Sequence, residues 1–419
     1  MATDPEILDL FPAGTQVIDG EIRIGGMRAR DLAEQFGTPA MLVDEVALRA
    51  RAREYVAGLS ARWPNSLVYF ASKAFPCTAI YRVMVEEGLG IDVAGGGELV
   101  MALKAGADPS RILLHGNAKS DEEIRMAVDA NVGIVVVDNH DDITRLEAVL
   151  DRPQDVLVRV RPGVVGHTHA AMETASETSK FGMSLGQAEQ AIARIRASRF
   201  LRLRGLHVHV GSQILRTEPF AEAVGALASL GEFEVYDLGG GLGERYTYAD
   251  TRVPVDAYLD VLTAAAREHL PAGAKILLEP GRSLTARSTV TMYRAVTVKD
   301  DGKTFVAVDG GMGDNLEVSL YGQRFEAVLP ERPFGTREVA VVGRHCESGD
   351  FLSDPATLAD PVVGDLVVVP VTGAYCFTMS NNYNGALRPP VVFVKHGSPT
   401  LLLRRETYDD LTRRDCSPH

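Results

Sequence analysis

The sequence has 419 residues and a hydrophobic share of 46%, which excludes a disordered or collagen-like chain and predicts more than one domain. Lys and Arg number 43 against 56 Asp and Glu, so the net charge of -13 argues against partners such as nucleic acids or anionic membranes. The 4 cysteines are too few for a disulfide framework and no apolar run is long enough to span a bilayer, so we expect a soluble, cytoplasmic protein.

Eight short apolar runs recur in the first two thirds of the chain, separated by segments with helical spacing. The runs are 67–71, 91–94, 112–114, 134–137, 156–160, 205–210, 235–238 and 276–279. Such Val-, Ile- and Leu-rich runs are typical of parallel strands covered on both faces by crossover helices. Helices are expected over 121–131, with Ser120 as N-cap, and over 221–230. The pattern predicts an α/β fold with a TIM-like (β/α)8 barrel, and an open doubly wound sheet is the alternative.

The sequence changes character after about residue 285, where β-branched runs and turn signals replace helical spacing. The runs are 289–298, 304–308, 339–342, 366–371 and 391–394. They predict a mainly β C-terminal domain, to which the region 20–26 contributes a strand. We therefore expect a barrel over 36–285 and a β domain built from 1–35 and 286–419.

Polar and glycine residues follow most of the predicted barrel strands. In chain order they are Lys73, Asp92, His115, Arg159, His207, His209, Ser212, the glycines of 239–243, Glu279, Gly281 and Arg282. Because the carboxyl ends of parallel strands share one rim of a barrel, where active sites of this fold lie, these residues are expected to converge.

Two glycine-rich turns near the last strands, at 239–243 and 279–282, favour a bound phosphate, because glycine lets backbone N–H groups approach oxygen atoms closely. The first turn is not a dinucleotide fingerprint, since Glu244 stands where the third glycine is needed. The residues 302–304 likewise lack the earlier glycine of a P-loop. The alternative is that these glycines serve only tight turns.

Lys73 lies at the end of a predicted buried strand, which suggests a task for its amine such as Schiff-base formation, although a rim lysine can simply reach solvent. With the phosphate turns and Glu279, it indicates pyridoxal phosphate, whose aldehyde, phosphate and ring nitrogen each need a partner.

Two histidine pairs offer a different interpretation. The pairs are His167 with His169 and His207 with His209, and neighbours at i and i+2 share a strand face from which they can ligate a metal. This pattern would suit a metal-dependent barrel hydrolase. No carboxylate-rich ligand set accompanies either pair in the sequence, so we expect no metal.

Ordered motifs between Tyr69 and Tyr383 resemble those of the fold type III pyridoxal-phosphate decarboxylases, and most closely the diaminopimelate decarboxylases. The motifs are Gly-Ile-Asp-Val-Ala at 90–94, His-Gly-Asn at 115–117, Ser-Lys-Phe-Gly at 179–182, Gly-Leu-His-Val-His-Val-Gly-Ser-Gln at 205–213, Asp-Leu-Gly-Gly-Gly-Leu-Gly at 237–243, Glu-Pro-Gly-Arg at 279–282, Val-Asp-Gly-Gly at 308–311, Cys-Glu-Ser-Gly-Asp at 346–350 and Gly-Ala-Tyr at 373–375. The resemblance implies a barrel followed by a β domain and a pyridoxal-phosphate cofactor.

The resemblance also implies a role for individual residues. Lys73 holds the cofactor through a Schiff base, His209 stacks on its ring and Glu279 pairs with its ring nitrogen. The phosphate is held by Gly240, Gly241, Gly281, Arg282, Tyr375 and Ser212. Cys346 protonates the carbanion and Glu347 binds the distal amino group of the amino-acid substrate. In this family the last two groups reach into the other subunit, which implies a homodimer with shared active sites.

One position departs from the family pattern. Glu317 stands four residues before Tyr321, where the family usually has an arginine that grips the retained substrate carboxylate together with Tyr321 and Arg282. A carboxylate cannot do so. Either a cation such as Arg324 or Arg344 takes this role, or the substrate carries an amine there and binds Glu317.

The resemblance implies decarboxylation of meso-2,6-diaminopimelate to L-lysine and CO2, in lysine biosynthesis. Because of Glu317, a D-lysine, D-ornithine or siderophore-precursor decarboxylase is the alternative within this chemistry. Outside it, the alternatives are the metal-dependent hydrolase and a catalytically dead binding protein.

Overall fold

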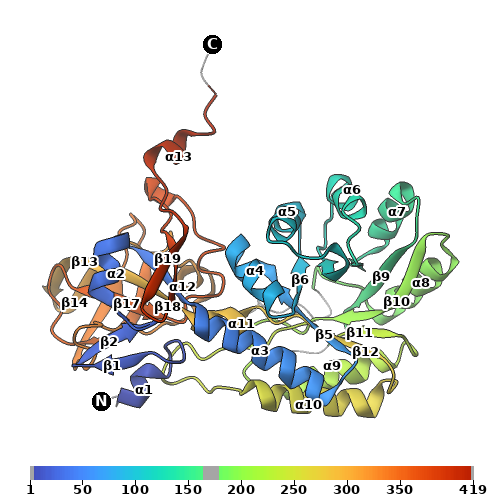
Figure 1. The fold of residues 1–419 in the computed structure, drawn as a ribbon, viewed down its shortest axis with the longest axis horizontal. Helices are drawn as coiled ribbons and strands as arrows, with labels where there is room; N and C mark the ends of the chain where they lie inside the picture. Colours follow the sequence, from blue (N-terminus) through green and yellow to red (C-terminus); the bar gives the residue numbers. More distant parts are fainter. Residues whose placement is uncertain (1–3, 164–178, 417–419) are drawn as a thin grey trace. The chain divides into compact units, whose positions relative to one another are not determined.

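The computed structural model describes residues 4–163 and 179–416, and the chain divides into two compact units (Figure 1). The barrel unit comprises 49–244 and 252–284, and the β unit comprises 1–48, 245–251 and 285–419. The first division falls inside α3 (Glu45–Arg62) rather than at residue 36, because β4 (Ala40–Asp44) pairs with strands of the β unit. In the described part of the chain, no helix has both the length and the apolar character of a membrane span.

Eight parallel strands close the barrel. They are β5 (Ser66–Ala71), β6 (Gly90–Val93), β7 (Ile112–Leu114), β8 (Ile134–Val137), β9 (Gln154–Val160), β10 (Leu201–Val208), β11 (Val235–Asp237) and β12 (Lys275–Leu278). The barrel closes where β12 pairs with β5, with Leu277 opposite Leu67. Tyr69, Leu113 and Leu157 belong to one buried apolar cluster of these strands. The predicted (β/α)8 barrel is confirmed, strand by strand.

Helices connect successive barrel strands, and Figure 1 shows α5 to α8 along the outside of β6 to β10. They are α4 (Thr78–Glu86), α5 (Gly96–Lys104), α6 (Asp121–Asp129), α7 (His140–Val149), α8 (Leu185–Ala197), α9 (Glu218–Ala228) and α10 (Val255–His269), and the short α11 (Arg282–Thr285) follows the last barrel strand. The expected cap of α6 is present, because Ser120 Oγ accepts from Glu123 N at 3.2 Å while Glu123 reaches back to Ser120 N at 3.0 Å.

The β unit contains an eight-stranded sheet in which β16-β15-β14-β13-β4-β18-β19 are neighbours and β17 also pairs with β13. Its other strands are β13 (Thr289–Asp301), β14 (Lys303–Val308), β15 (Arg337–Val342), β16 (Phe351–Leu358), β17 (Leu366–Pro370), β18 (Val391–Lys395) and β19 (Ser398–Leu403). Its helices are α1 (Asp4–Leu8), α2 (Ala29–Phe36), α12 (Glu317–Tyr321) and α13 (Tyr408–Thr412). The mainly β character predicted for the C-terminal part is confirmed.

The strand expected in 20–26 forms, but in a separate antiparallel sheet of β1 (Gln16–Ile18), β2 (Glu21–Ile24) and β3 (Met27–Arg28). Ile22 and Ile24 point into the same buried cluster as Leu42 and Val392 of the large sheet. The small sheet is therefore part of the core of the β unit.

Candidate active site

The polar residues selected at the strand ends lie at one rim of the barrel unit. Lys73 follows β5, Asp92 lies on β6, His115 follows β7, Arg159 lies on β9, His207 lies on β10 and His209 follows it, and Glu279 follows β12. Asp237, which was not among the polar residues predicted for the rim, ends β11. Asp138 follows β8, the barrel strand for which no rim residue was predicted. Its signal was the same as for the others, a polar residue directly after a buried apolar run.

Lys73 lies in a single turn of 3-10 helix, Ser72–Ala74, where its neighbours are buried and its own side chain is exposed. Burial and the charge of Glu279 raise the pKa of Asp92 well above its usual value, and Lys73 acts against them. Burial and then the charge of Lys73 hold the pKa of His209 well below its usual value. The ammonium group must lie near both side chains, so Lys73 faces the barrel mouth.

A buried carboxylate occupies the centre of the rim. The Nε2 atom of His115 contacts Glu279 Oε1, and the Nε2 atom of His207 lies 3.3 Å from Glu279 Oε2. The two imidazole rings meet edge to face, with centroids 4.6 Å apart. Asp237 completes a group of ligand-type atoms within 4.8 Å of one another. The expectation that no carboxylates accompany His207 is therefore wrong, because closure of the barrel brings strands distant in sequence together.

The proton states in this cluster follow from burial and from contacts. Burial would raise the pKa of Glu279, but the electrostatic attraction and the hydrogen bonds of His115 and His207 outweigh it and hold the pKa well below its usual value. Burial lowers the pKa of His115 to about 3, although Glu279 acts in the opposite direction. Burial and the Glu279 charge raise the pKa of Asp237 well above its usual value. Glu279 is thus the anion of the cluster, and a neutral imidazole donates to each of its oxygens.

The glycine turns after β11 and β12 pack backbone against backbone. A Cβ atom on Gly240 would lie 2.1 Å from Glu279 O, and one on Gly241 would lie 2.5 Å from Gly211 O. A Cβ on Gly281 would come within 3.1 Å of the Ala71 side chain. Only glycine fits at positions 240 and 241, whereas a Cβ at position 281 would be a tight contact. Their backbones therefore lie beside the loops after β5, β10 and β12.

Polar side chains line the same turns. The Arg282 Nε donates to Ser212 Oγ at 3.3 Å, which joins the loop after β12 to the loop after β10. Gly240 N donates to His209 Nδ1 at 3.2 Å, so the half-buried imidazole of His209 is fixed by the backbone of the glycine turn. These hydrogen bonds join the loops after β10, β11 and β12, with the Arg282 guanidinium group among them.

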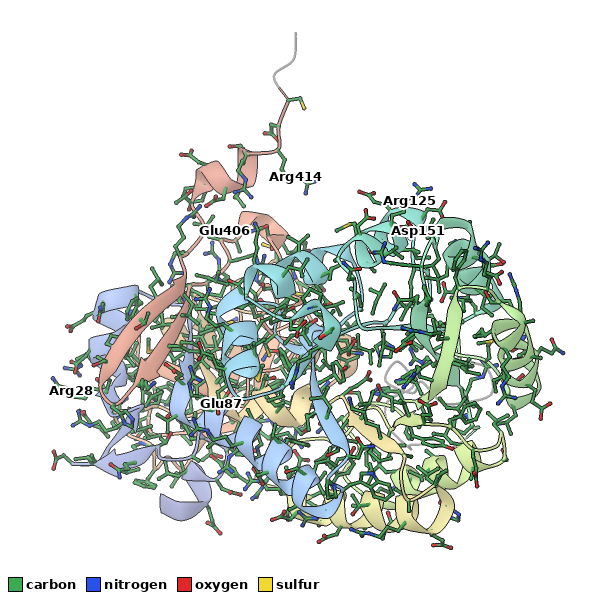
Figure 2. All side chains as sticks on the ribbon, turned by 45° about the vertical axis from the view of Figure 1, so that its right-hand side comes forward. Arg28, Glu87, Arg125, Asp151, Glu406 and Arg414 are labelled. Carbon is green, nitrogen blue, oxygen red and sulfur yellow. The ribbon has the colours of Figure 1, made fainter. Side chains whose placement is uncertain are left out.

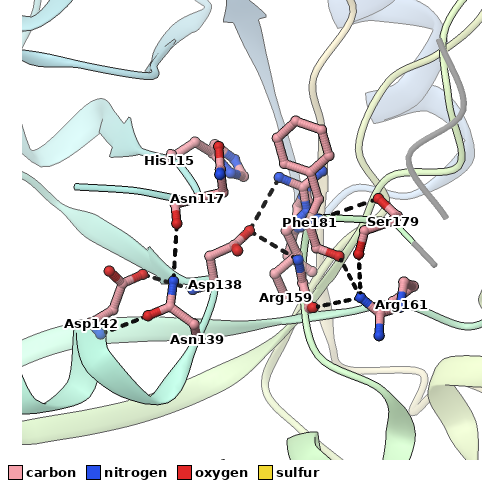
Figure 3. Close-up of polar contacts among 12 residues, drawn as sticks. His115, Asn117, Asp138, Asn139, Asp142, Arg159, Arg161, Ser179 and Phe181 are labelled. Carbon is pink, nitrogen blue, oxygen red and sulfur yellow. Dashed lines mark hydrogen bonds and ion pairs between the residues drawn. The ribbon is translucent and has the colours of Figure 1, made fainter. Parts of the chain in front are cut away.

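Figure 3 shows a second polar network, around Arg159 and Asp138 at the ends of β9 and β8. The Arg159 NH1 atom lies 3.5 Å from Asp138 Oδ1, and its guanidinium carbon lies 4.7 Å from the centre of the Phe181 ring. Arg161 donates to Ser179 O at 2.6 Å, and Gly182 N donates to Asp138 Oδ1 at 3.1 Å. The segment 179–182 is thereby attached to the rim. His167 and His169 lie outside the described residues.

Cys346 and Glu347 lie on an exposed loop of the β unit, between β15 and β16. The buried Asp350 holds the loop, since its carboxylate accepts from Met312 N at 2.6 Å and from His345 N at 2.8 Å. Cys346 N donates to Asn384 Oδ1 at 2.9 Å.

The C-terminal segment supports the neighbouring loop that carries Asn384. Glu406, labelled in Figure 2, accepts from Asn382 Nδ2 at 2.6 Å and from Arg388 N at 2.9 Å. Asn384 follows Asn382 and Tyr383 in a short turn and has a left-handed φ of 53°. The backbone at Cys346 is therefore tied to this supported loop, although the thiol is exposed.

The remaining predicted residues of the β unit differ in exposure. Glu317 begins α12 and is fully buried, while Tyr321 at the end of that helix is half-buried. Tyr375 is also half-buried and has a left-handed φ of 65°. Its neighbour Cys376 is buried, with Sγ 3.4 Å from Asn315 Oδ1. Full burial of Glu317 was not expected for a residue assigned to substrate binding.

Residues 48–286 match the family described as "Pyridoxal-dependent decarboxylase, pyridoxal binding domain". A diaminopimelate decarboxylase of Actinosynnema pretiosum subsp. auranticum is 44% identical to this chain, and the alignment covers 97% of this chain and 95% of the relative's own length. A diaminopimelate decarboxylase of Bacillus subtilis is 39% identical over 94% of this chain and 95% of its own length.

Solved structures agree with this likeness. The diaminopimelate decarboxylase of M. jannaschii in co-complex with L-lysine has a TM-score of 0.91 to this chain at 28% identity, covering 97% of this chain and 98% of its own. The fold, the barrel mouth and the sequence likeness agree. The chain belongs to the diaminopimelate decarboxylase family of pyridoxal-dependent decarboxylases.

Proposed function

We propose that this chain uses pyridoxal phosphate to decarboxylate the D-centre of meso-2,6-diaminopimelate, giving L-lysine and CO2. The observation that carries the proposal is the set of residues at the ends of the barrel strands, where Lys73 acts electrostatically on Asp92, His115 contacts Glu279, and Gly240 packs against the backbone of Glu279. The substrate is supported by relatives named diaminopimelate decarboxylase, the first of which is 44% identical over 97% of this chain. Neither the hydrolase nor a binding protein has comparable support.

The residues of the mouth fit pyridoxal phosphate. Lys73 offers an amine for the aldehyde, and Glu279 offers an anion for a protonated ring nitrogen. The turns with Gly240, Gly241 and Gly281, where a Cβ would strike neighbouring atoms, present main chain to a phosphate. The side chains of Ser212 and Arg282 lie 3.3 Å apart beside these turns, and we assign Tyr375 to the same phosphate. His209, held by Gly240 N, suits stacking against the ring.

When bound, the cofactor supplies a sink for the electron pair left by the departing carboxylate. The chain's own residues then have separate tasks. Glu279 keeps a proton on the ring nitrogen, because an anion there favours the protonated ring. The Cys346 thiol gives a proton to the substrate carbon that lost CO2, and Glu347 binds the distal amino group. Tyr321 and Arg282 bind the retained carboxylate.

We further propose a homodimer in which Cys346 and Glu347 act in the site of the partner subunit. Both side chains are exposed on a loop whose backbone is held by Asp350 and Asn384, so they are available to a second chain. The cytoplasmic location stays a prediction.

Borohydride reduction of the purified holoenzyme followed by peptide mapping tests the cofactor assignment. We expect a pyridoxyl group on Lys73. Lys119 is the matched control within the barrel, because it is buried and its Nζ lies 2.7 Å from Asp142 Oδ2. A pyridoxyl group on Lys119 or on the exposed Lys104 would refute the assignment.

A substrate panel with CO2 detection tests the reaction. We expect a higher kcat/KM for meso-2,6-diaminopimelate than for D-lysine or D-ornithine. Two unit charges about 4 Å apart interact by about 4 kcal/mol at an effective dielectric of 20, so a cation that takes the role of the missing arginine should be decisive. Arg324→Ala or Arg344→Ala should therefore harm diaminopimelate turnover selectively. A preference for D-lysine that reverses in Glu317→Arg would establish a diamine decarboxylase instead.

A further inference from the structure

Two histidines each contact one carboxylate oxygen of Glu279. His115 Nε2 contacts Oε1, and His207 Nε2 lies 3.3 Å from Oε2, so each oxygen has its own imidazole. His207 is 1% exposed and His115 is 7% exposed, and Glu279 itself is 5% exposed. The contacts are therefore shielded from water. Hydrogen bonds to a charged group are stronger in such a buried environment than in water.

The surrounding structure keeps both imidazoles in place. His207 lies on β10, and its ring packs edge to face on that of His115 at 4.6 Å. His115 N donates to Val93 O at 2.8 Å. The loop after His115 is held by the buried Lys119, whose Nζ donates to Gly116 O and to Asp142 Oδ2, both at 2.7 Å. A shift of either ring would break contacts on more than one side.

We infer that His115 and His207 are positioning residues that hold Glu279 as an oriented anion for the ring nitrogen of pyridoxal phosphate, an inference that rests on the proposed function. Without donors, a carboxylate this deeply buried would take up a proton, because burial disfavours its charged form. A neutral carboxyl group would no longer favour a proton on the ring nitrogen. The low pKa of Glu279 and the low pKa of His115 agree with an anion held by neutral donors.

The same atoms suggest one competing role. His115, His207, Asp237 and Glu279 offer ligand atoms within 4.8 Å of one another, a set that a divalent ion can bind. The hydrogen-bonded role is favoured because both Nε2 atoms already face carboxylate oxygens, and because Asp237, with a pKa raised well above its usual value by burial and the Glu279 charge, holds a proton. Metal binding is therefore one outcome of the test.

The test compares two cofactors on the apoprotein. Equilibrium binding of pyridoxal phosphate and of its 1-deaza analogue, in which a carbon replaces the ring nitrogen, is measured for wild type, His115→Leu and His207→Leu. Each substitution should weaken binding of pyridoxal phosphate about tenfold to a hundredfold, because it removes a hydrogen bond from a buried charge, and should change binding of the deaza analogue by less than about twofold. His115→Gln and His207→Gln keep an N–H donor and should restore most of the affinity.

Two controls sharpen the comparison. His269→Leu changes a histidine of α10 outside the cluster, and neither cofactor should bind differently. In Glu279→Gln, adding His115→Leu should cost no further affinity, because the histidine acts only through the carboxylate. Circular dichroism checks the fold, and His115→Asn, too short to reach Glu279, replaces the leucine variant if that one is unfolded.

Each result is decisive. An equal loss for both cofactors would overturn the inference, because it would show a general structural role. Stoichiometric zinc binding by EDTA-treated apoprotein that is lost in His115→Leu would also overturn it, in favour of a metal site. Wild-type protein that binds neither cofactor would instead refute the proposed function itself.

Discussion

The candidate functional residues of the barrel unit and of the β unit differ in their exposure to solvent. In the barrel, Glu279, His207 and Asp237 are at most 5% exposed and hydrogen-bond within the unit. In the β unit, Cys346 and Glu347 are exposed. Burial and hydrogen bonds fix the proton state of the barrel residues, whereas the two side chains of the β unit stay accessible. Under the proposed function, the buried groups hold the cofactor and the exposed groups reach the substrate.

Exposure in the β unit does not mean a loose backbone. A Cβ atom on Gly343 would lie 2.2 Å from Asp350 Oδ2, and one on Gly311 would lie 2.5 Å from Asp350 Oδ1. The carboxylate therefore fills the space between two chain segments and accepts from both. The β unit therefore holds the main chain around Cys346 and Glu347 firmly, while these two side chains are exposed.

The largest expected effect comes from removing one reactive group from each unit. Lys73→Ala and Cys346→Ala should each lower kcat by about 10³-fold or more, since one loses the covalent link to the cofactor and the other the proton donor. Mixing the two proteins should restore about a quarter of wild-type activity, because half of randomly mixed dimers pair one chain of each kind and have one intact site of two. CO2 release measures the recovery.

Lys104→Ala, on the exposed face of α5, is the control and should keep full activity. Absence of recovery while mass-labelled subunits demonstrably exchange would mean that each site is built from one chain.

The second effect concerns a buried carboxyl group of the β unit, that of Asp314. Burial raises the pKa of Asp314 to about 7, so between its ordinary value near 4 and pH 7 the folded state keeps a proton that the unfolded state has lost. The free energy of unfolding should therefore fall by about 2 to 4 kcal/mol as the pH rises through this range, and level off above it. Asp314→Asn keeps an acceptor for Gly311 N and should remove this fall.

Urea unfolding at pH 5 and pH 8 measures the effect, and Asp314→Asn should exceed wild type in stability only at pH 8. Asp300→Asn, a surface carboxylate paired with Arg337, is the control. An unchanged pH dependence in Asp314→Asn would show that the side chain is ionised in the folded protein.

The third effect concerns the hydrogen bond that supports the backbone of the loop carrying Cys346. Asn384→Gly tolerates the left-handed φ of 53° but removes the oxygen that accepts from Cys346 N. We expect kcat to fall about fivefold, the equivalent of one hydrogen bond, with the absorbance of the bound cofactor unchanged. Asn384→Asp retains the acceptor and should recover most of kcat. A change in cofactor absorbance would contradict a role confined to the β unit.

The smallest effect tests whether barrel stability alone alters the site. Ser120→Ala removes the N-cap of α6 and should lower the free energy of unfolding by about 1 kcal/mol or less, with kcat unchanged. Thermal unfolding and CO2 release measure the two quantities. A clear loss of kcat would mean that the rim is less independent of its helices than its buried contacts imply.

The barrel could be predicted because each strand is a short apolar run, whereas β16 and β19 were missed for a physical reason. Pro355 and Pro399 interrupt their patterns, and both strands lie at an edge of the sheet, where a residue without a backbone N–H is tolerated. β4 was not predicted as a strand, and the boundary at residue 36 placed it with the barrel, since an apolar run of five residues does not reveal which sheet it joins.

Lys73, His209 and Glu279 could be predicted from sequence alone because each follows a barrel strand, and the carboxyl ends of parallel strands share one rim. The contacts among His115, His207 and Glu279 could not be predicted, since they join β7, β10 and β12 and exist only once the barrel closes. Burial of Glu317 was equally hidden, because carboxylates are usually exposed and only tertiary packing overrides that preference.

The central place of β4 in the large sheet has a consequence for synthesis on the ribosome. All five of its residues are buried, and its partners β13 and β18 are translated only after the entire barrel. Until then β4 is an apolar segment with neither edge paired, and such segments are prone to associate with other nascent chains. The β unit can complete its sheet only when nearly the whole chain has emerged, so chaperone binding should concentrate on its amino-terminal segment.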